Sequence, residues 1–194
     1  MSTLPKPFLT LEDYLKIERA AECKSEYYGG EMFAISGARR AHNLISMNVG
    51  SGLHAQLRRR PCEVYPSDMR VLVSATGLYT YPDVVVACSE PQFADGVMNT
   101  LVNPTLLVAV LSPSTEAYDR GRKFEQYRKI ESLRQFLLVA SDRVSVELYT
   151  RQASGLWLFS SASEPDEEVD LETIECRLRV GDIYEKVEFE IEQK

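Results

Sequence analysis

The sequence has no long hydrophobic run. No apolar stretch in its 194 residues approaches the roughly 18–20 residues that a membrane-spanning helix needs. The first fifteen residues also lack a basic head followed by an apolar stretch, so no secretory signal is expected. We therefore expect a cytoplasmic protein that does not contact a membrane.

Cysteine is scarce as well. Its four residues are spread over the chain, at Cys23, Cys62, Cys88 and Cys176. No Cys-x-x-Cys pair occurs, so the spacing predicts neither a zinc site nor a disulfide framework. Four free thiols in a reducing cytosol are the expectation.

Internal repeats and low-complexity linkers are absent too. A chain of this length is large enough to bury a proper core in one domain. We expect a single domain over residues 1–194. Its first part, residues 1–60, would hold N-terminal helices and a hairpin, residues 62–140 the core with the site, and residues 141–194 strands and an acidic tail.

A net positive charge is missing, since the chain carries −7. The distribution matters more than this total. From Glu164 to Lys194 there are 12 acidic and 4 basic residues, so the rest of the chain is close to neutral. Between Thr115 and Arg134, 6 basic residues outnumber 4 acidic ones. A local basic groove could bind phosphates transiently, although ordinary solvated faces would have the same composition.

What the sequence does contain is a mixture of helical and strand-like patterns. Two short apolar runs, within Tyr81–Cys88 and Thr105–Leu111, are bounded by turn residues as buried strands are. Gly29-Gly30 between two aromatic-rich arms predicts a hairpin over residues 25–35. Helices are expected over 10–23, 39–60 and 116–130, further strands over 64–73, 135–140, 144–150, 156–162 and 174–180, and a helical turn over 183–187. This order predicts a mixed α/β fold.

Asp83 stands at the start of the first buried run, directly after Pro82. A carboxylate beside a buried strand costs free energy unless it is paired or binds a cation. If the chain reverses symmetrically about Gly96, Asp83 faces Ala109 across an antiparallel pair. Carboxylates at both positions could hold one Mg²⁺, but this chain offers a carboxylate and a methyl group. Asp83 could instead accept hydrogen bonds from nearby backbone N–H groups.

Three segments, in this order, resemble a known family: Tyr81–Val86 (YPDVVV), Leu107–Thr115 (LVAVLSPST) and Tyr118–Tyr127 (YDRGRKFEQY). The family consists of restriction-endonuclease-like proteins that are abundant in cyanobacteria, and it belongs to the PD-(D/E)xK nuclease superfamily. Residues that also match family positions are Glu26-Tyr27, Gly30-Glu31, His42 and Ser67–Val71. The resemblance covers nearly the whole chain.

The resemblance implies a restriction-endonuclease-like fold, with a central mixed sheet flanked by helices. It also implies hydrolysis of DNA phosphodiesters that depends on Mg²⁺ or Mn²⁺. The metal would polarise the phosphate and activate water, and a lysine would stabilise the anionic transition state. The usual lysine position falls at Leu111, so the family's helix lysine, Lys123, would take this role, with Gln126 and His42 as further site residues. Asp83 would be the metal ligand.

Ala109 departs from the family pattern, because the family has a glutamate there. A methyl group cannot hold a cation, so metal affinity and rate should both fall. Asp68 would be a weak substitute ligand, because it is expected about 10 Å along the strand from the residue that pairs with Asp83. Glu26 or Glu31 could approach Asp83 from elsewhere in the fold. Two functions stay open: an impaired metal-dependent endonuclease, or a catalytically inactive nucleic-acid-binding or regulatory homologue.

Other interpretations of these residues are purely structural. Lys123 could pair only with Asp119, four residues before it. Asp68 and Arg70 could form a surface pair, and His42 could be a hydrogen-bonded structural residue. Ser112, Ser114 and Thr115 are expected to cap the following helix, and the ten tyrosines to pack in the core rather than to stack on bases. Enzymes of this fold often act as dimers, so the expected partners are DNA and a second copy; a purely structural homodimer is the third alternative.

Overall fold

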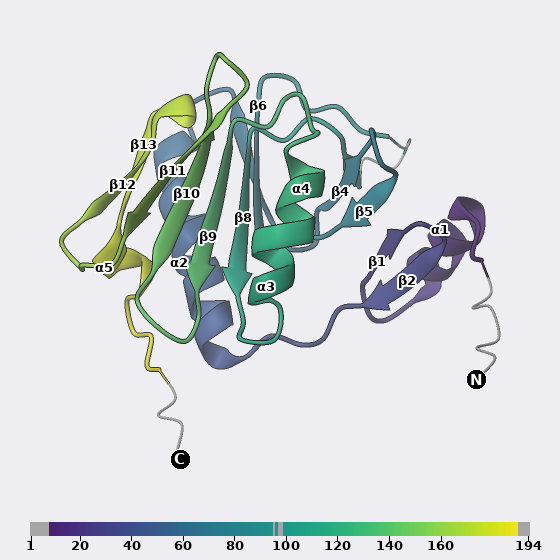
Figure 1. Cartoon of the computed structure of the whole chain (residues 1–194), viewed down its shortest axis with the longest axis horizontal. Helices are drawn as coiled ribbons and strands as arrows, with labels where there is room; N and C mark the ends of the chain where they lie inside the picture. Colours follow the sequence, from purple (N-terminus) through teal and green to yellow (C-terminus); the bar gives the residue numbers. More distant parts are fainter. Residues whose placement is uncertain (1–7, 95, 97–98, 190–194) are drawn as a thin grey trace.

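A six-stranded mixed sheet forms the centre of the computed structural model, which describes residues 8–94, 96 and 99–189. Strands β8 and β9 run parallel, and the other neighbours are antiparallel. In spatial order the strands are β11 (Trp157–Ala162), β10 (Val146–Arg151), β9 (Gln135–Ala140), β8 (Leu106–Leu111), β6 (Val84–Cys88) and β3 (Cys62–Pro66). The expected mixed sheet flanked by helices is confirmed (Figure 1).

Helices cover both faces of this sheet. Helix α2 (Arg40–Leu57) lies behind it in Figure 1, and α3 (Glu116–Tyr118) and α4 (Phe124–Tyr127) lie in front. Successive residues of a strand point to opposite faces. Val84 and Val108 accordingly pack on the α2 side, whereas Leu107 and Ala109 share the core on the α4 side. Both central strands are therefore buried, which explains their continuous apolar runs.

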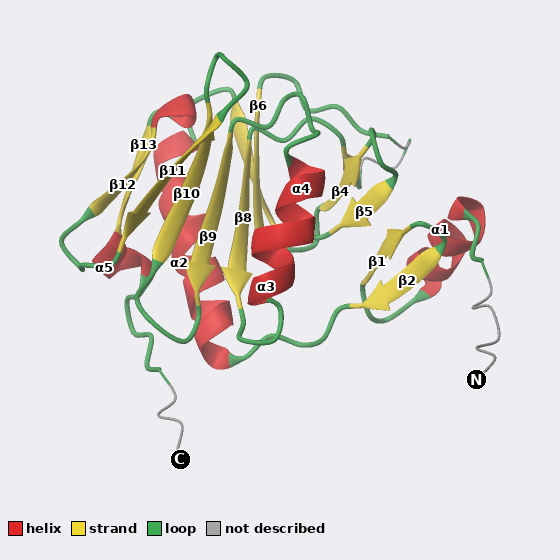
Figure 2. Cartoon of the chain, viewed as in Figure 1, coloured by secondary structure: helices red, strands yellow, loops and turns green. Residues whose placement is uncertain are grey.

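A second sheet joins the N-terminal segment to the rest. Its five strands, in spatial order, are β2 (Glu31–Ala34), β1 (Ser25–Tyr28), β5 (Leu78–Thr80), β4 (Arg70–Val73) and β7 (Thr100–Leu101). Helix α1 (Leu11–Ala20), capped by the Thr10 hydroxyl, packs on it through the buried rings of Tyr14, Tyr27 and Tyr79. Figure 2 shows α1, β1 and β2 projecting from the main body. The predicted hairpin is confirmed, with positive φ at Gly29 and Gly30.

The C-terminal part adds a small sheet to the α2 side. Strands β12 (Glu168–Leu171) and β13 (Cys176–Arg179) pair with each other, with the 3-10 turn Glu172–Ile174 between them and α5 (Val180–Ile183) after them. Their apolar residues pack against α2. Strand β12 was not predicted, and the predicted helical turn begins three residues earlier than expected. No described helix combines the length and hydrophobicity needed to cross a membrane.

The single strand predicted over 64–73 is wrong. The chain instead turns at Ser67–Met69, where the Met69 N–H donates to the Pro66 carbonyl, and passes from the six-stranded to the five-stranded sheet. The sequence pattern suggested one strand because two short strands of different sheets are separated by only three residues. The helix predicted over 116–130 ends at Tyr127 and contains a π turn, Asp119–Lys123. The connection between the two buried runs contains a short strand, β7, that was not predicted.

The prediction of four free thiols is also wrong. Cys62 and Cys88 are register partners on β3 and β6 and form a disulfide, whereas Cys23 and Cys176 are free. The two residues are 26 positions apart, so only the strand pairing brings them together. Sequence spacing alone carries no sign of it.

Candidate functional site

The register of β6 against β8, extended by one residue, puts Asp83 opposite Ala109, as the symmetric reversal predicts. Strand β6 pairs with β8 through Val84↔Val108 and the two following pairs, and the Asp83 N–H donates to the Val108 carbonyl at 3.0 Å. The predicted register is correct even though the segment between β6 and β8 is not a simple hairpin turn, because it contains strand β7. The expected turn is centred on Gly96, whose neighbours 95, 97 and 98 lie outside the described residues.

Both carboxylate oxygens of Asp83 have partners within the protein. Oδ2 accepts a hydrogen bond from the Val110 N–H at 2.7 Å. Oδ1 lies 3.2 Å from Nε2 of His42, which the first turn of α2 places there. Burial opposes protonation of His42, but the hydrogen bond and the negative charge of Asp83 more than offset it and raise the imidazole pKa. The strand acid is therefore held by a histidine and a backbone amide.

The π turn between α3 and α4 supplies the lysine. Lys123 Nζ lies 2.8 Å from Oε1 of Glu26, on β1, and 3.5 Å from Oδ1 of Asp119. Its side chain is 12% exposed, so the ammonium group is almost enclosed. Burial alone would lower the pKa of Lys123, but Tyr127, Glu26 and Asp119 raise it. The predicted i,i+4 pairing with Asp119 is confirmed, and π turns of this kind often occur at functional sites.

Two buried hydroxyl groups, those of Thr80 and Tyr127, help to orient the Glu26 carboxylate. The Thr80 hydroxyl donates to Oε1 of Glu26 at 2.5 Å and lies 3.0 Å from the Tyr127 hydroxyl. Tyr127 is fully buried, and burial raises its pKa. Burial also raises the pKa of Asp119, while Lys123 acts in the opposite direction. We call Glu26, His42, Asp83, Asp119 and Lys123 the acid–lysine cluster.

The other predicted site residues lie outside this cluster. Asp68 sits in the turn after β3, pairs with Lys24 at 2.9 Å, and is 84% exposed. The predicted Asp68–Arg70 pair is wrong, because the Arg70 guanidinium donates to the Thr100 hydroxyl. Gln126 lies on α4, and its side-chain carbonyl oxygen is buried with no hydrogen-bond partner among the described residues. Glu31 lies on β2, opposite Tyr28.

Two members of the cluster were weakly signalled by the sequence. Glu26 was one of two acids that could approach from elsewhere, and only the pairing of β1 with β5 brings it to Lys123. Asp119 was signalled only by its spacing of four from Lys123. Both residues lie in segments that match the family, but only the three-dimensional arrangement brings their carboxylates to Lys123.

The donor set does not fit a divalent metal. Mg²⁺ requires several oxygen ligands in octahedral geometry. Asp83 faces a methyl group, and the carboxylates of Glu26 and Asp119 both pair with Lys123. In the part of the chain that the structure describes, no three His, Cys, Asp or Glu side chains are grouped so that they could hold a metal ion.

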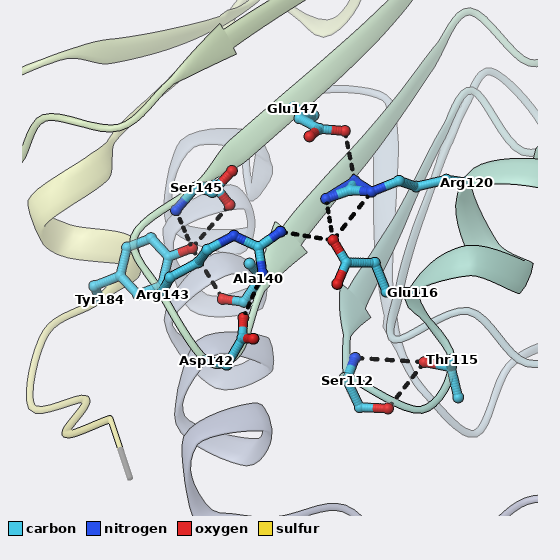
Figure 3. A network of polar contacts seen from close by, with 10 residues as sticks. All are labelled: Ser112, Thr115, Glu116, Arg120, Ala140, Asp142, Arg143, Ser145, Glu147 and Tyr184. Carbon is cyan, nitrogen blue, oxygen red and sulfur yellow. Dashed lines mark hydrogen bonds and ion pairs between the residues drawn. The ribbon is translucent and has the colours of Figure 1, made fainter. Parts of the chain in front are cut away.

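A second polar network surrounds Glu116, at the start of α3 (Figure 3). Oε1 of Glu116, at the start of α3, accepts hydrogen bonds from Arg120 at 2.7 Å and Arg143 at 2.6 Å. Arg120 also contacts Glu147 on β10 at 2.6 Å. The hydrogen bond from Arg143 holds the pKa of Glu116 below its usual value. Thr115 makes no side-chain cap to α3, contrary to the prediction, and its hydroxyl lies 3.0 Å from that of Ser112.

A mixed sheet with an acid beside one core strand, and a lysine supplied after the next core strand, is the arrangement that a restriction-endonuclease-like fold implies. Comparison with known families agrees with this class. The profile of the Uma2 family, described as "Putative restriction endonuclease", matches residues 11–181. The chain belongs to this family.

Two uncharacterized proteins of Synechocystis sp. (strain PCC 6803) are similar to the chain. One is 36% identical over 185 residues, covering 95% of this chain and 96% of the relative. The other is 35% identical over 162 residues, covering 84% and 92%. Among solved structures, a "putative nuclease belonging to DUF820" from Anabaena variabilis has the same fold, with a TM-score of 0.75 and 20% identity over 93% of this chain and 99% of its own.

Proposed function

We propose that this protein binds DNA through its nuclease fold but has lost most or all metal-dependent hydrolysis of phosphodiester bonds. The observation that supports this best is the register of β6 and β8, whose pair Val84↔Val108 puts Ala109 at the next position, opposite Asp83. Asp83 remains as one possible metal ligand, but Ala109, at the position that faces it, offers only a methyl group. Without a second carboxylate there, the charge stabilisation that a metal gives to the transition state is weakened.

The contacts around the cluster support the same proposal. His42 and the Val110 amide occupy the two oxygens of Asp83, and Lys123 draws Glu26 and Asp119 toward itself. Three carboxylates thus face one ammonium group, that of Lys123, and one imidazole, and each carboxylate already has a partner within the protein.

A weakly active endonuclease is the second candidate. The position of Lys123 favours it, because its ammonium group lies in the cluster and could stabilise negative charge on a phosphate. On this alternative, the fold would still hydrolyse DNA in Mg²⁺ or Mn²⁺, at a rate reduced by the missing ligand. The two candidates share a substrate and differ only in turnover.

One pair of assays separates the candidates. Fluorescence anisotropy with a labelled DNA duplex in EDTA measures binding, and a cleavage assay with the same duplex in MgCl₂ or MnCl₂ measures turnover. We expect saturable binding that weakens with salt, as phosphate contacts require, and no cleavage by the unmodified chain.

The Ala109→Glu variant serves as the positive test and Ala109→Gln as its neutral control. Cleavage gained only by Ala109→Glu supports a lost ligand in an otherwise intact site. Cleavage by the unmodified chain at a comparable rate would favour the endonuclease. Absence of DNA binding by all three proteins would contradict both candidates.

A further inference from the structure

The six-stranded sheet has an open edge at β11. Within the described chain, β11 pairs only with β10, from Val146↔Ala162 to Arg151↔Trp157. The strands that follow, β12 and β13, pair with each other in a separate sheet. An unpaired strand edge presents a row of backbone donors and acceptors to which another chain can add a strand.

Strand β11 lacks the features that usually protect such an edge. Its six residues, WLFSSA, include no charged residue, proline or glycine. Large apolar side chains at this edge are exposed: Leu156 by 71%, Leu158 by 60% and Phe159 by 50%. Natural edge strands are commonly blunted by lysine, by proline or by a bulge. This edge is instead suited to burial against a similar apolar strand.

The outward-pointing backbone groups of β11 can be identified. The Gln152 N–H donates to the Leu156 carbonyl at 2.8 Å, so these two residues form a hydrogen-bonded pair that closes the β10–β11 turn. Hydrogen-bonded and non-hydrogen-bonded pairs alternate along an antiparallel ladder. Every second residue from Leu156 therefore bonds to β10. Trp157, Phe159 and Ser161 lie between them and direct their N–H and C=O groups to the open side.

The two ends of β11 carry opposite charges. Near its start, the Arg151 N–H donates to the Arg134 carbonyl at 2.8 Å, and the Arg151 guanidinium donates to the Arg128 carbonyl. The Arg151 guanidinium also donates to the Glu131 carbonyl at 3.2 Å, so three arginines and one acidic residue lie on this side and its net charge is positive. Just after its end, four exposed acidic residues occur with no basic residue among them, at Glu164, Asp166, Glu167 and Glu168.

We propose that β11 pairs with β11 of a second copy, antiparallel and about a twofold axis near Phe159 and Ser160. Each copy then offers the same strand to the other, so the interface closes on itself and one sheet runs through both. Antiparallel pairing places the basic start of one β11 beside the acidic segment of the other. Arg151 stands one strand in from the edge, about 10 Å from the second copy's strand, which is within reach of a charge at moderate salt.

The first test is the mass in solution of the full chain, measured by size-exclusion chromatography with light scattering at micromolar concentration. We expect twice the chain mass of 22.0 kDa. Ser161→Pro removes an outward N–H that the β10 ladder does not use, and Leu158→Lys adds an edge charge; both should give monomers. Met47→Lys, at a 68% exposed residue of α2, is the matched control and should remain a dimer.

The second test concerns the charges. The double variant Glu164→Lys, Asp166→Lys should weaken the dimer about tenfold, and adding Arg151→Glu should restore part of the loss. Circular dichroism confirms that each variant is folded. A monomeric unmodified chain would overturn the proposal. So would folded Ser161→Pro and Leu158→Lys proteins that stay dimeric, or a Met47→Lys protein that dissociates as readily as they do.

Discussion

At the scale of single residues, Lys123 joins two segments that are far apart in the sequence. It pairs with Glu26 and with Asp119, and the three side chains are only 12%, 11% and 7% exposed. Buried charges are stable only when each has a partner of opposite charge, so removing the lysine leaves both carboxylates uncompensated. The lysine therefore has a structural role whether or not the site acts on DNA.

Replacing Lys123 by methionine should destabilise the protein by about 3–5 kcal/mol, because two buried carboxylates lose their counter-ion. Chemical denaturation at neutral pH measures this change. The double variant Lys123→Met, Glu26→Gln should recover part of the loss. Equal stability of the single variant and the unmodified protein would show that water, rather than Lys123, satisfies these carboxylates.

Some residues of the site could be placed from the sequence, and others could not. Asp83 and Ala109 could be placed opposite each other because a strand acid, a turn and a second apolar run fix one register. Glu26 could not be placed, since no local pattern reports which strand of another sheet β1 joins. The disulfide partners Cys62 and Cys88 were missed for the same reason.

At the scale of elements, the network around Glu116 fastens the start of α3 to the sheet. Arg120 links it to Glu147 on β10, and Arg143 links it to the turn before that strand. The lowered pKa of Glu116 means that its charged form stabilises the fold. That stabilisation is complete above the ordinary glutamate value of 4.5 and is lost as the pH falls through the lowered value.

Glu116→Gln should therefore lower stability at neutral pH by less than about 1 kcal/mol, since the pairs are partly solvated. The difference from the unmodified protein should shrink as the pH falls below 4.5. Urea unfolding at a series of pH values measures it. A difference that stays constant into the acid range would rule out the charge of Glu116 as the cause.

The disulfide joins the edge strand β3 to the central strand β6 across a separation of 26 residues. A loop of that length should contribute about 3.5 kcal/mol, chiefly by restricting the unfolded chain. Dithiothreitol should lower the guanidinium midpoint of the unmodified protein and leave that of Cys62→Ser, Cys88→Ser unchanged. Cys23→Ser, at an exposed free thiol, should respond to dithiothreitol as the unmodified protein does.

Element boundaries could be predicted where the periodicity is long and failed where elements are short. Helix α2 and strands β9 to β11 lie where they were expected. The split of residues 64–73 between two sheets, strand β7 and the π turn were missed, because two to five residues carry too little periodicity. The π turn matters most among these, since it contains both Asp119 and Lys123.

At the scale of the whole molecule, two sheets meet around one cluster of charged side chains. The six-stranded sheet supplies Asp83 beside β6, and the five-stranded sheet supplies Glu26 from β1. Helix α2 adds His42 and the π turn adds Lys123. The fold class could be inferred from three matching segments, whereas the convergence of four elements on one cluster depends on tertiary packing.

We propose that position 109 decides whether this cluster can hold a divalent metal. Isothermal titration of Mg²⁺ or Mn²⁺ into the unmodified chain, Ala109→Glu and Ala109→Gln measures this. We expect no measurable heat of binding at millimolar metal for the unmodified chain and the glutamine variant, and saturable binding for Ala109→Glu. Tight metal binding by the unmodified chain, or no binding by a natively folded Ala109→Glu protein, would show that another feature of the site controls metal binding.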